Sequence, residues 1–135
     1  MKCQSMSVLA LTELTQDNSK LTHMLEKHKN FPILTDPKNT RVGLCVPSFF
    51  RGNVDIIGSW QHCEARKQKS QIACQITTFK LKLSTVTIAM SVVYLVPDAS
   101  ESCAQAMCTE MVLLSGVHTY YAAIGDFNID QKLYR

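Results

Sequence analysis

Two neighbouring segments, Gln71–Phe79 (QIACQITTF) and Thr85–Tyr94 (TVTIAMSVVY), decide the fold class of this chain. Both are rich in β-branched and aromatic residues, which favour extended backbone. The short polar stretch Lys80–Ser84 between them predicts that the two strands form a hairpin. A sheet is therefore expected at the centre of the molecule.

Further strands are predicted on both sides of this hairpin. They are short apolar runs bounded by glycine, proline or polar residues, at Ser7–Thr12, Val42–Val46, Val54–Ile57 and Thr119–Ile124. The polar stretch Gln61–Ser70 is expected to be an exposed loop.

Two helices are predicted between the strands. The first begins at Asn18 or Ser19 and ends at Phe31-Pro32, because proline disfavours helical geometry in the residue before it. The second follows a capping box of Asp98 and Glu101 and ends near Gly116. The residues expected to share one helix face are Leu21, Met24, Leu25 and His28 in the first helix and Ala104, Met107, Cys108 and Met111 in the second. This order of elements predicts a layered α/β or α+β fold, in which helices pack on one face of a mixed β-sheet.

Length and composition fit one globular domain. The chain has 135 residues, of which 46% are hydrophobic and 19% charged, and this balance excludes a disordered, collagenous or low-complexity protein. The net charge of +3 suits a phosphate-rich partner without requiring one. No linker or charge block divides the sequence, so we expect a single domain over residues 1–135.

The N-terminal sequence argues against secretion and against a membrane partner. Its apolar run, Val8–Leu11, is soon followed by Glu13 and is too short for a signal-peptide core or a membrane span. We therefore expect an intracellular protein, nuclear or cytoplasmic, whose six cysteines are reduced and mostly buried.

The spacing of the cysteines does not indicate a zinc knuckle. Cys103 and Cys108 have four residues between them, and His62 is adjacent to Cys63. Structural zinc sites need two such pairs, and no second pair completes either one.

The tetrapeptide Gly125-Asp126-Phe127-Asn128, directly after the last predicted strand, is the strongest functional signal. Asp126 and Asn128 are two residues apart, so in extended backbone their side chains project on the same side. A carboxylate and an amide in this arrangement can orient a water molecule and a phosphate oxygen. The alternative interpretation is an Asp/Asn-rich turn without a functional role.

Four segments in a fixed order carry a family resemblance. They are Leu9–Glu13, Arg41–Pro47, Val92–Pro97 and Ile124–Asp130. The first resembles a strand that ends in a metal-binding glutamate, the third a tyrosine-proline strand end, and the last a family signature. Together they resemble the endonuclease/exonuclease/phosphatase superfamily, in particular the endonuclease domain of non-LTR retrotransposon reverse transcriptases.

This resemblance implies a magnesium-dependent phosphodiesterase, specifically a DNA endonuclease of the retroelement type. It implies that Glu13 ligates Mg²⁺, or Mn²⁺ in its place, through hard carboxylate oxygens. It further implies that Tyr94 lies near the scissile phosphate, that Asp126 positions or deprotonates the attacking water, and that Asn128 holds a phosphate oxygen. We expect these four residues to meet at one edge of the sheet, and the DNA backbone is the implied partner. Asp130, next to the motif, is interpreted as an exposed turn residue.

The sequence also departs from the family pattern. It begins after the strand that usually carries a metal-site asparagine, and it ends before a second Asp/Asn pair and a Ser-Asp-His segment; no histidine of this chain matches that segment. Leu14 replaces a threonine, and Leu95 stands where retroelement enzymes often carry a phosphate-binding arginine. We therefore expect a truncated domain that is weakly active or inactive as this chain.

Two other hypotheses remain open at this point. One is a non-catalytic binding or interaction module that retains half of the fold. The other is a DNA-repair or phosphoesterase fragment of the same superfamily. In each case an incomplete sheet leaves an open edge, and we expect such an edge to favour self-association.

Overall fold

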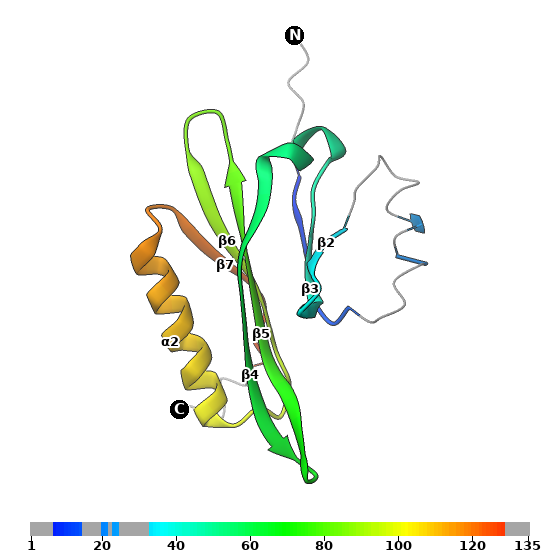
Figure 1. Cartoon of the computed structure of the whole chain (residues 1–135), viewed down its shortest axis with the longest axis vertical. Coiled ribbons are helices and arrows are strands. Elements are labelled where there is room, and N and C mark those ends of the chain that lie inside the picture. The colour runs from blue at the N-terminus through cyan, green and yellow to red at the C-terminus, as the bar shows by residue number, and fades with distance from the viewer. Residues whose placement is uncertain (1–6, 15–19, 22, 25–32, 129–135) are drawn as a thin grey trace.

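The chain forms two facing β-sheets and a long helix, shown in Figure 1. The structure, a computed structural model, describes residues 7–14, 20–21, 23–24 and 33–128. The strands are β1 (Leu9–Leu11), β2 (Ile33–Asp36), β3 (Asn39–Cys45), β4 (Val54–Arg66), β5 (Lys69–Lys82), β6 (Thr87–Leu95) and β7 (Tyr121–Asp126), and the helices are η1 (Ser48–Asn53) and α2 (Glu101–Val117). The layered α/β class predicted from the sequence is confirmed, and the strands divide between two sheets.

The first sheet has three strands in the order β1-β3-β2, all antiparallel. Its central strand β3 contributes Val42, Leu44 and Cys45, which are fully buried because β3 also contacts β5 and β6 of the second sheet. The edge strand β2 was not predicted. Its four residues, Ile33-Leu34-Thr35-Asp36, are too few to display a strand pattern.

The second sheet has the order β4-β5-β6-β7, with β6 and β7 parallel and the other pairs antiparallel. The predicted hairpin of Gln71–Phe79 with Thr85–Tyr94 is its centre. Buried side chains of β5 and β6, among them Ile76, Phe79 and Val92, form the core.

The prediction that Gln61–Ser70 is an exposed loop was wrong, because this segment is the tip of the β4–β5 hairpin. Pairing continues to Arg66↔Lys69, and the turn residues Lys67 and Gln68 have φ angles of 47° and 66°. Two positive φ angles are typical of a two-residue type I′ turn, here without the usual Asn-Gly sequence. Near this tip, the side chains of the edge strand β4 alternate between half-buried and exposed positions. Neither face of the strand is fully buried there, so polar residues are tolerated on both faces.

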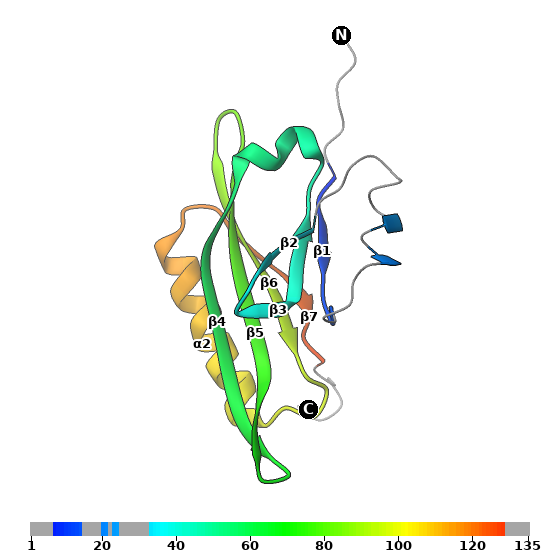
Figure 2. The same ribbon diagram turned by 45° about the vertical axis from the view of Figure 1, so that its right-hand side comes forward.

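Helix α2 packs on the face of the second sheet that is opposite the first sheet (Figures 1 and 2). Cys103 and Met107 are its fully buried residues. Residues Ala104, Met111 and Leu114 pack against the same core. Cys108, predicted on the buried face, is exposed, because the helix contacts the sheet along the line from Cys103 to Met107.

The predicted capping box of Asp98 and Glu101 was also wrong. The N-cap of α2 is Ser100, whose Oγ accepts a hydrogen bond from the Cys103 N–H at 3.1 Å. The Asp98 carboxylate instead lies 2.8 Å from the Arg66 guanidinium. Asp98, which the sequence pattern predicted as a helix cap, therefore forms an ion pair with the β4–β5 hairpin instead.

Most of the first predicted helix lies outside the described residues. Lys20, Leu21, His23 and Met24 have helical backbone. Asn18, Ser19, Leu25, His28 and Phe31-Pro32 belong to the part that the structure does not describe. Within the described ranges, no helix combines the length and apolar character needed to cross a membrane.

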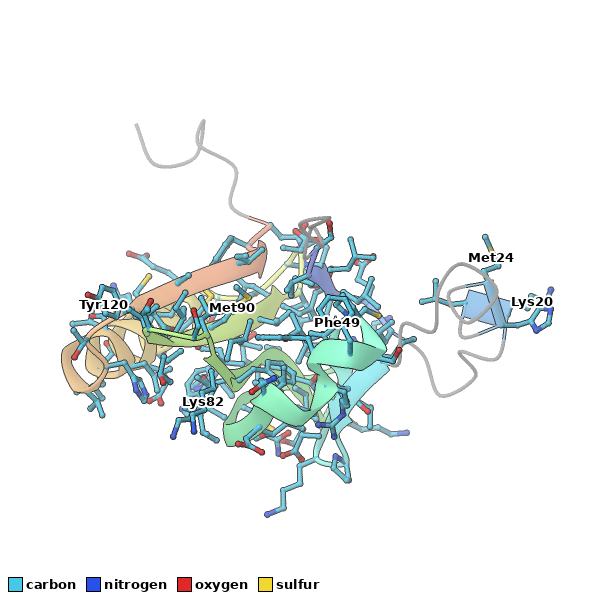
Figure 3. All side chains as sticks on the ribbon, turned by 90° about the horizontal axis from the view of Figure 1, so that it is seen from above. Lys20, Met24, Phe49, Lys82, Met90 and Tyr120 are labelled. Carbon is cyan, nitrogen blue, oxygen red and sulfur yellow. The ribbon has the colours of Figure 1, made fainter. Side chains whose placement is uncertain are left out.

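Several apolar side chains remain exposed around α2 and β7. Val112, Leu113 and Val117 on the outer side of α2 are 68%, 60% and 78% exposed. Tyr120, labelled in Figure 3 beside the connection from α2 to β7, is 53% exposed, and Ile124 on β7 is 45% exposed. This apolar surface adjoins β7, which is an edge of the four-stranded sheet.

Three buried cysteines predict that the protein loses stability in alkali. Burial raises the pKa of Cys45 to about 11, that of Cys74 to about 12 and that of Cys103 to about 11. A thiol of the unfolded chain ionises near pH 8.5, so the folded state binds more protons above that pH. The contribution of these thiols to the free energy of unfolding is complete below about pH 8.5 and is lost as the pH rises through the folded pKa values. The loss is on the order of 1–3 kcal/mol per thiol.

Urea unfolding under reducing conditions, at about pH 8 and at about pH 10.5, measures this loss. Cys74→Ala should reduce the pH dependence, because it removes the most strongly shifted thiol. Cys63→Ser, at an exposed position, should leave it unchanged. An equal free energy of unfolding at the two pH values would contradict the expectation.

Candidate active site

The candidate site lies where β6 and β7 end. Tyr94 is the penultimate residue of β6 and Asp126 the last residue of β7, and the two are register partners in the parallel pair. The carboxyl ends of parallel strands lie at the same edge of a sheet, where ligand sites are common in α/β proteins. This pairing brings together two residues that are widely separated in sequence.

Glu13 reaches the same edge from the other sheet. It lies two residues after the end of β1, and its Oε1 accepts a hydrogen bond from the Tyr94 hydroxyl at 3.3 Å. Its φ angle is 56°, in the left-handed region that non-glycine residues seldom adopt. The Leu14 N–H, which donates to the Arg41 carbonyl at 3.0 Å, holds the chain in this turn.

Asn128 is the second site residue with left-handed backbone, at φ 44°. Its N–H donates to the Asp126 Oδ1 at 3.2 Å, and its Nδ2 donates to the Leu95 carbonyl at 2.6 Å. These two bonds fix the side chains of Asp126 and Asn128 relative to the end of β6. Left-handed non-glycine residues cost about 1–3 kcal/mol each and tend to cluster at functional sites.

Tyr94 is buried beneath this group, at 6% exposure. Burial raises the pKa of its hydroxyl, the nearby Glu13 charge raises it further, and Arg41 partly offsets both. The Arg41 guanidinium carbon lies 5.9 Å from the centre of the Tyr94 ring, which is within the range of a cation–π contact. The phenol therefore stays protonated at neutral pH and acts as a hydrogen-bond donor that orients Glu13.

Sequence reasoning missed two residues that support the site, Arg41 and Gln75. The Arg41 N–H donates to the Gln75 Oε1 at 3.1 Å, and Gln75, only 2% exposed, is the register partner of Tyr94. The Arg41 carbonyl in turn holds the residue after Glu13. Gln75 thus connects the two sheets beneath the site. A polar residue inside the otherwise apolar run of β5 was the signal that could have identified it.

Replacing Gln75 by leucine is expected to lower stability and to disturb Glu13. The change leaves the partly buried Arg41 N–H without an acceptor, which costs about 1–3 kcal/mol. Urea unfolding measures that cost, and amide chemical shifts of Glu13 and Leu14 report the disturbance. Gln71→Leu, at an exposed position of the same strand, is the matched control. Unchanged shifts in the Gln75 variant would show that this connection does not position Glu13.

Of the described histidines, His62 and His118 lie away from the site. His62 faces α2, where it stacks on Trp60, and His118 follows the end of α2 and stacks on Tyr121. A cavity of about 610 Å³ also lies on that side of the sheet, next to Lys80, Leu114 and His118. Asp130 lies outside the described residues. The candidate site is thus an open sheet edge and not part of this cavity.

The donor atoms at the edge are chemically suited to a hard divalent cation. Glu13 is exposed and Asp126 is half-buried, so both carboxylates are accessible to an ion. Mg²⁺ and Mn²⁺ favour carboxylate oxygens and retain several waters. The hydrogen bonds from Tyr94 to Glu13 and from the Asn128 N–H to Asp126 each leave further lone pairs on the carboxylates.

No protein-family model and no curated protein matches the sequence. Solved structures do match the fold. One is D. rerio TDP2 complexed with a single-strand DNA product, with a TM-score of 0.60 at 13% identity over 92% of this chain and 48% of that chain. Another is the human Nocturnin catalytic domain with bound sulfate, with a TM-score of 0.53 at 12% identity over 91% and 51%. A third is ANGEL2, a 2′,3′-cyclic phosphatase, with a TM-score of 0.54 at 13% identity over 92% and 40%.

The chain therefore spans about half the length, or less, of the structures it matches. Identities of this size show the fold alone. None of the three is a retroelement endonuclease. The two sheets and helix of this chain correspond to about half of the endonuclease/exonuclease/phosphatase fold.

Proposed function

We propose that this chain supplies the metal- and phosphate-binding part of a phosphodiester hydrolase, a DNA endonuclease of the retroelement type. The observation that carries the proposal is the meeting of Glu13, Tyr94, Asp126 and Asn128 at one sheet edge. Two of these residues hold left-handed backbone, a conformation that tertiary contacts must stabilise.

Each residue has a role that its contacts support. Glu13, oriented by the Tyr94 hydroxyl, would hold Mg²⁺ or Mn²⁺, and a bound ion would stabilise negative charge on phosphoryl oxygens. Asp126 would position the attacking water and accept its proton. The Asn128 amide has a second N–H besides the one bonded to Leu95, and it would donate this N–H to a phosphate oxygen.

DNA is the partner that we propose for this site. The net charge of +3 favours a polyanion. The D. rerio TDP2 structure of similar fold is complexed with single-strand DNA, which adds support for a nucleic-acid substrate at this edge. The exposed Arg41 beside Tyr94 provides one cationic group for the phosphate backbone.

Nicking of supercoiled plasmid tests the proposal. We expect slow nicking by the 135-residue chain that requires Mg²⁺, stops with EDTA, and falls at least about 10²-fold in Glu13→Gln. Glu101→Gln, an exposed position in the first turn of α2, is the matched control and should nick at the wild-type rate. Nicking that survives in Glu13→Gln would contradict the assignment of this residue. Rapid turnover by the chain alone would contradict the expectation of weak activity.

A non-catalytic binding or interaction module is the second candidate, favoured by the edge position of β7 and the apolar side chains exposed near it. Such a module would bind DNA without cleaving it, and its binding would not depend on Mg²⁺. The open edge of β7 and the apolar side chains Ile124, Tyr120 and Val117 near it also support self-association. Sedimentation of the purified chain separates a monomer from such an assembly.

A further inference from the structure

A second group of metal-ligating side chains lies on the other face of the four-stranded sheet, between β4 and the N-terminal end of α2. His62, Glu64 and Cys103 each offer one ligand atom, and these three atoms lie within 4.8 Å of one another. His62 and Glu64 are two residues apart on β4, so both point to the face that α2 covers. Cys103 belongs to the first turn of α2 and is fully buried beneath them.

The donor set is chemically specific. An imidazole nitrogen, a thiolate sulfur and a carboxylate oxygen together suit Zn²⁺ and neighbouring first-row metals, whereas Mg²⁺ takes oxygen ligands. Three protein ligands with a fourth position left to water form a familiar zinc arrangement. The set therefore differs in kind from the carboxylates at the end of β7.

His62 and Glu64 are each held by a neighbour that leaves lone pairs available for a metal ion. The His62 ring stacks on Trp60, with centroids 6.0 Å apart. The Glu64 Oε1 accepts hydrogen bonds from the Ser100 N–H, at 3.2 Å, and from the Ser100 hydroxyl, and the Oε2 accepts a longer one from the same N–H, at 3.4 Å. A carboxylate has further lone pairs, and metal-bound carboxylates commonly accept such bonds.

The surrounding charges favour a dication. Arg66 is the nearby cation, and it lies 2.8 Å from Asp98 but 3.8 Å from Glu64, so Asp98 is its main partner. Glu64, Asp98 and Arg66 together leave one negative charge. A Cys103 thiolate would add a second one, which a divalent ion balances. Capping of α2 by Ser100 explains the position of Glu64, but it does not explain why His62 and Cys103 meet there.

We propose that His62, Glu64 and Cys103 form a binding site for Zn²⁺ or a similar first-row transition-metal ion. On binding, the Cys103 thiol releases its proton to solvent and a sulfur lone pair forms the bond to the ion, with no change of oxidation state. Sequence spacing missed this site because it paired His62 with Cys63 and Cys103 with Cys108. Cys63 and Cys108 are exposed. The proposed ligands His62 and Cys103 belong to different elements, β4 and α2, so their sequence spacing carries no signal.

Cobalt titration of the reduced, chelator-treated full chain tests this proposal. We expect one equivalent of Co²⁺ to produce a thiolate-to-cobalt charge-transfer band, and one equivalent of Zn²⁺ to abolish it by displacement. Cys103→Ala and His62→Ala should each weaken binding at least about 100-fold. Because His62 is only half-buried, its variant remains a fair test if Cys103→Ala fails to fold.

The control variants are Cys3→Ser, Cys63→Ser and Cys108→Ser, which should all keep the band. Excess Mg²⁺ and the Glu13→Gln variant should also leave it unchanged, since the two proposed sites use different residues on opposite faces. A wild-type chain without the band would overturn the proposal. So would a band that persists at full strength in both His62→Ala and Cys103→Ala.

Discussion

Replacing Gly125 by alanine is expected to separate β7 from β6 and to lower the free energy of unfolding by more than about 3 kcal/mol. A Cβ atom on Gly125 would overlap the Val93 carbonyl oxygen and would lie 2.7 Å from the Val93 carbonyl carbon. These are backbone atoms of a central strand, so they cannot move away as a flexible side chain would. Glycine is therefore required here by the close approach of two parallel strands.

The same substitution should displace the candidate site, because Asp126 is the next residue and pairs with Tyr94. Urea unfolding and the amide resonance of Asp126 measure the two effects. Gly58→Ala and Gly116→Ala are matched controls, since no atom lies within 4 Å of a Cβ at either position. If Gly125→Ala were as stable as these controls, with an unchanged Asp126 resonance, the close approach of β7 to β6 at Gly125 would not require glycine.

Replacing Asp126 by asparagine is expected to remove the residual nicking activity, by about 10²–10⁴-fold. The amide has nearly the shape of the carboxylate and still accepts a hydrogen bond from the Asn128 N–H, so the turn after β7 should persist. It cannot take a proton from water and carries no charge for a cation. The loss should therefore appear in the rate and not in the stability.

Plasmid nicking with Mg²⁺ measures this loss, with urea unfolding as the check on folding. The control is Asp55→Asn, an exposed position at the start of β4. Equal rates for wild type and Asp126→Asn would remove Asp126 from the proposed mechanism, whatever the absolute activity of the chain.

The sequence allowed the prediction of those parts of the fold whose pattern is local. The β5–β6 hairpin follows from two long runs of β-forming residues, and β3 follows from the apolar run that precedes Pro47. Tyr94, Asp126 and Asn128 were predicted as site residues partly because each stands at or just after a strand end, and their roles stay predictions. Glu13 follows the same pattern two residues after the end of β1.

Contacts between elements could not be predicted in the same way. The tip of the β4–β5 hairpin is polar because β4 is an edge strand, so its composition resembles that of a loop. The bond from Arg41 to Gln75 depends on how two sheets face each other. The meeting of His62 with Cys103 depends on where α2 begins. None of these pairings has a periodicity or a spacing that a single sequence displays.

Mn²⁺ binding followed by nuclear magnetic resonance tests the central claim most directly, because it does not depend on turnover. Substoichiometric Mn²⁺ should broaden the amide resonances of Glu13, Tyr94 and Asp126 selectively, excess Mg²⁺ should reverse the broadening, and Glu13→Gln should abolish it. Broadening that is centred elsewhere, or that is unchanged in Glu13→Gln, would contradict the existence of a divalent-cation site at this sheet edge.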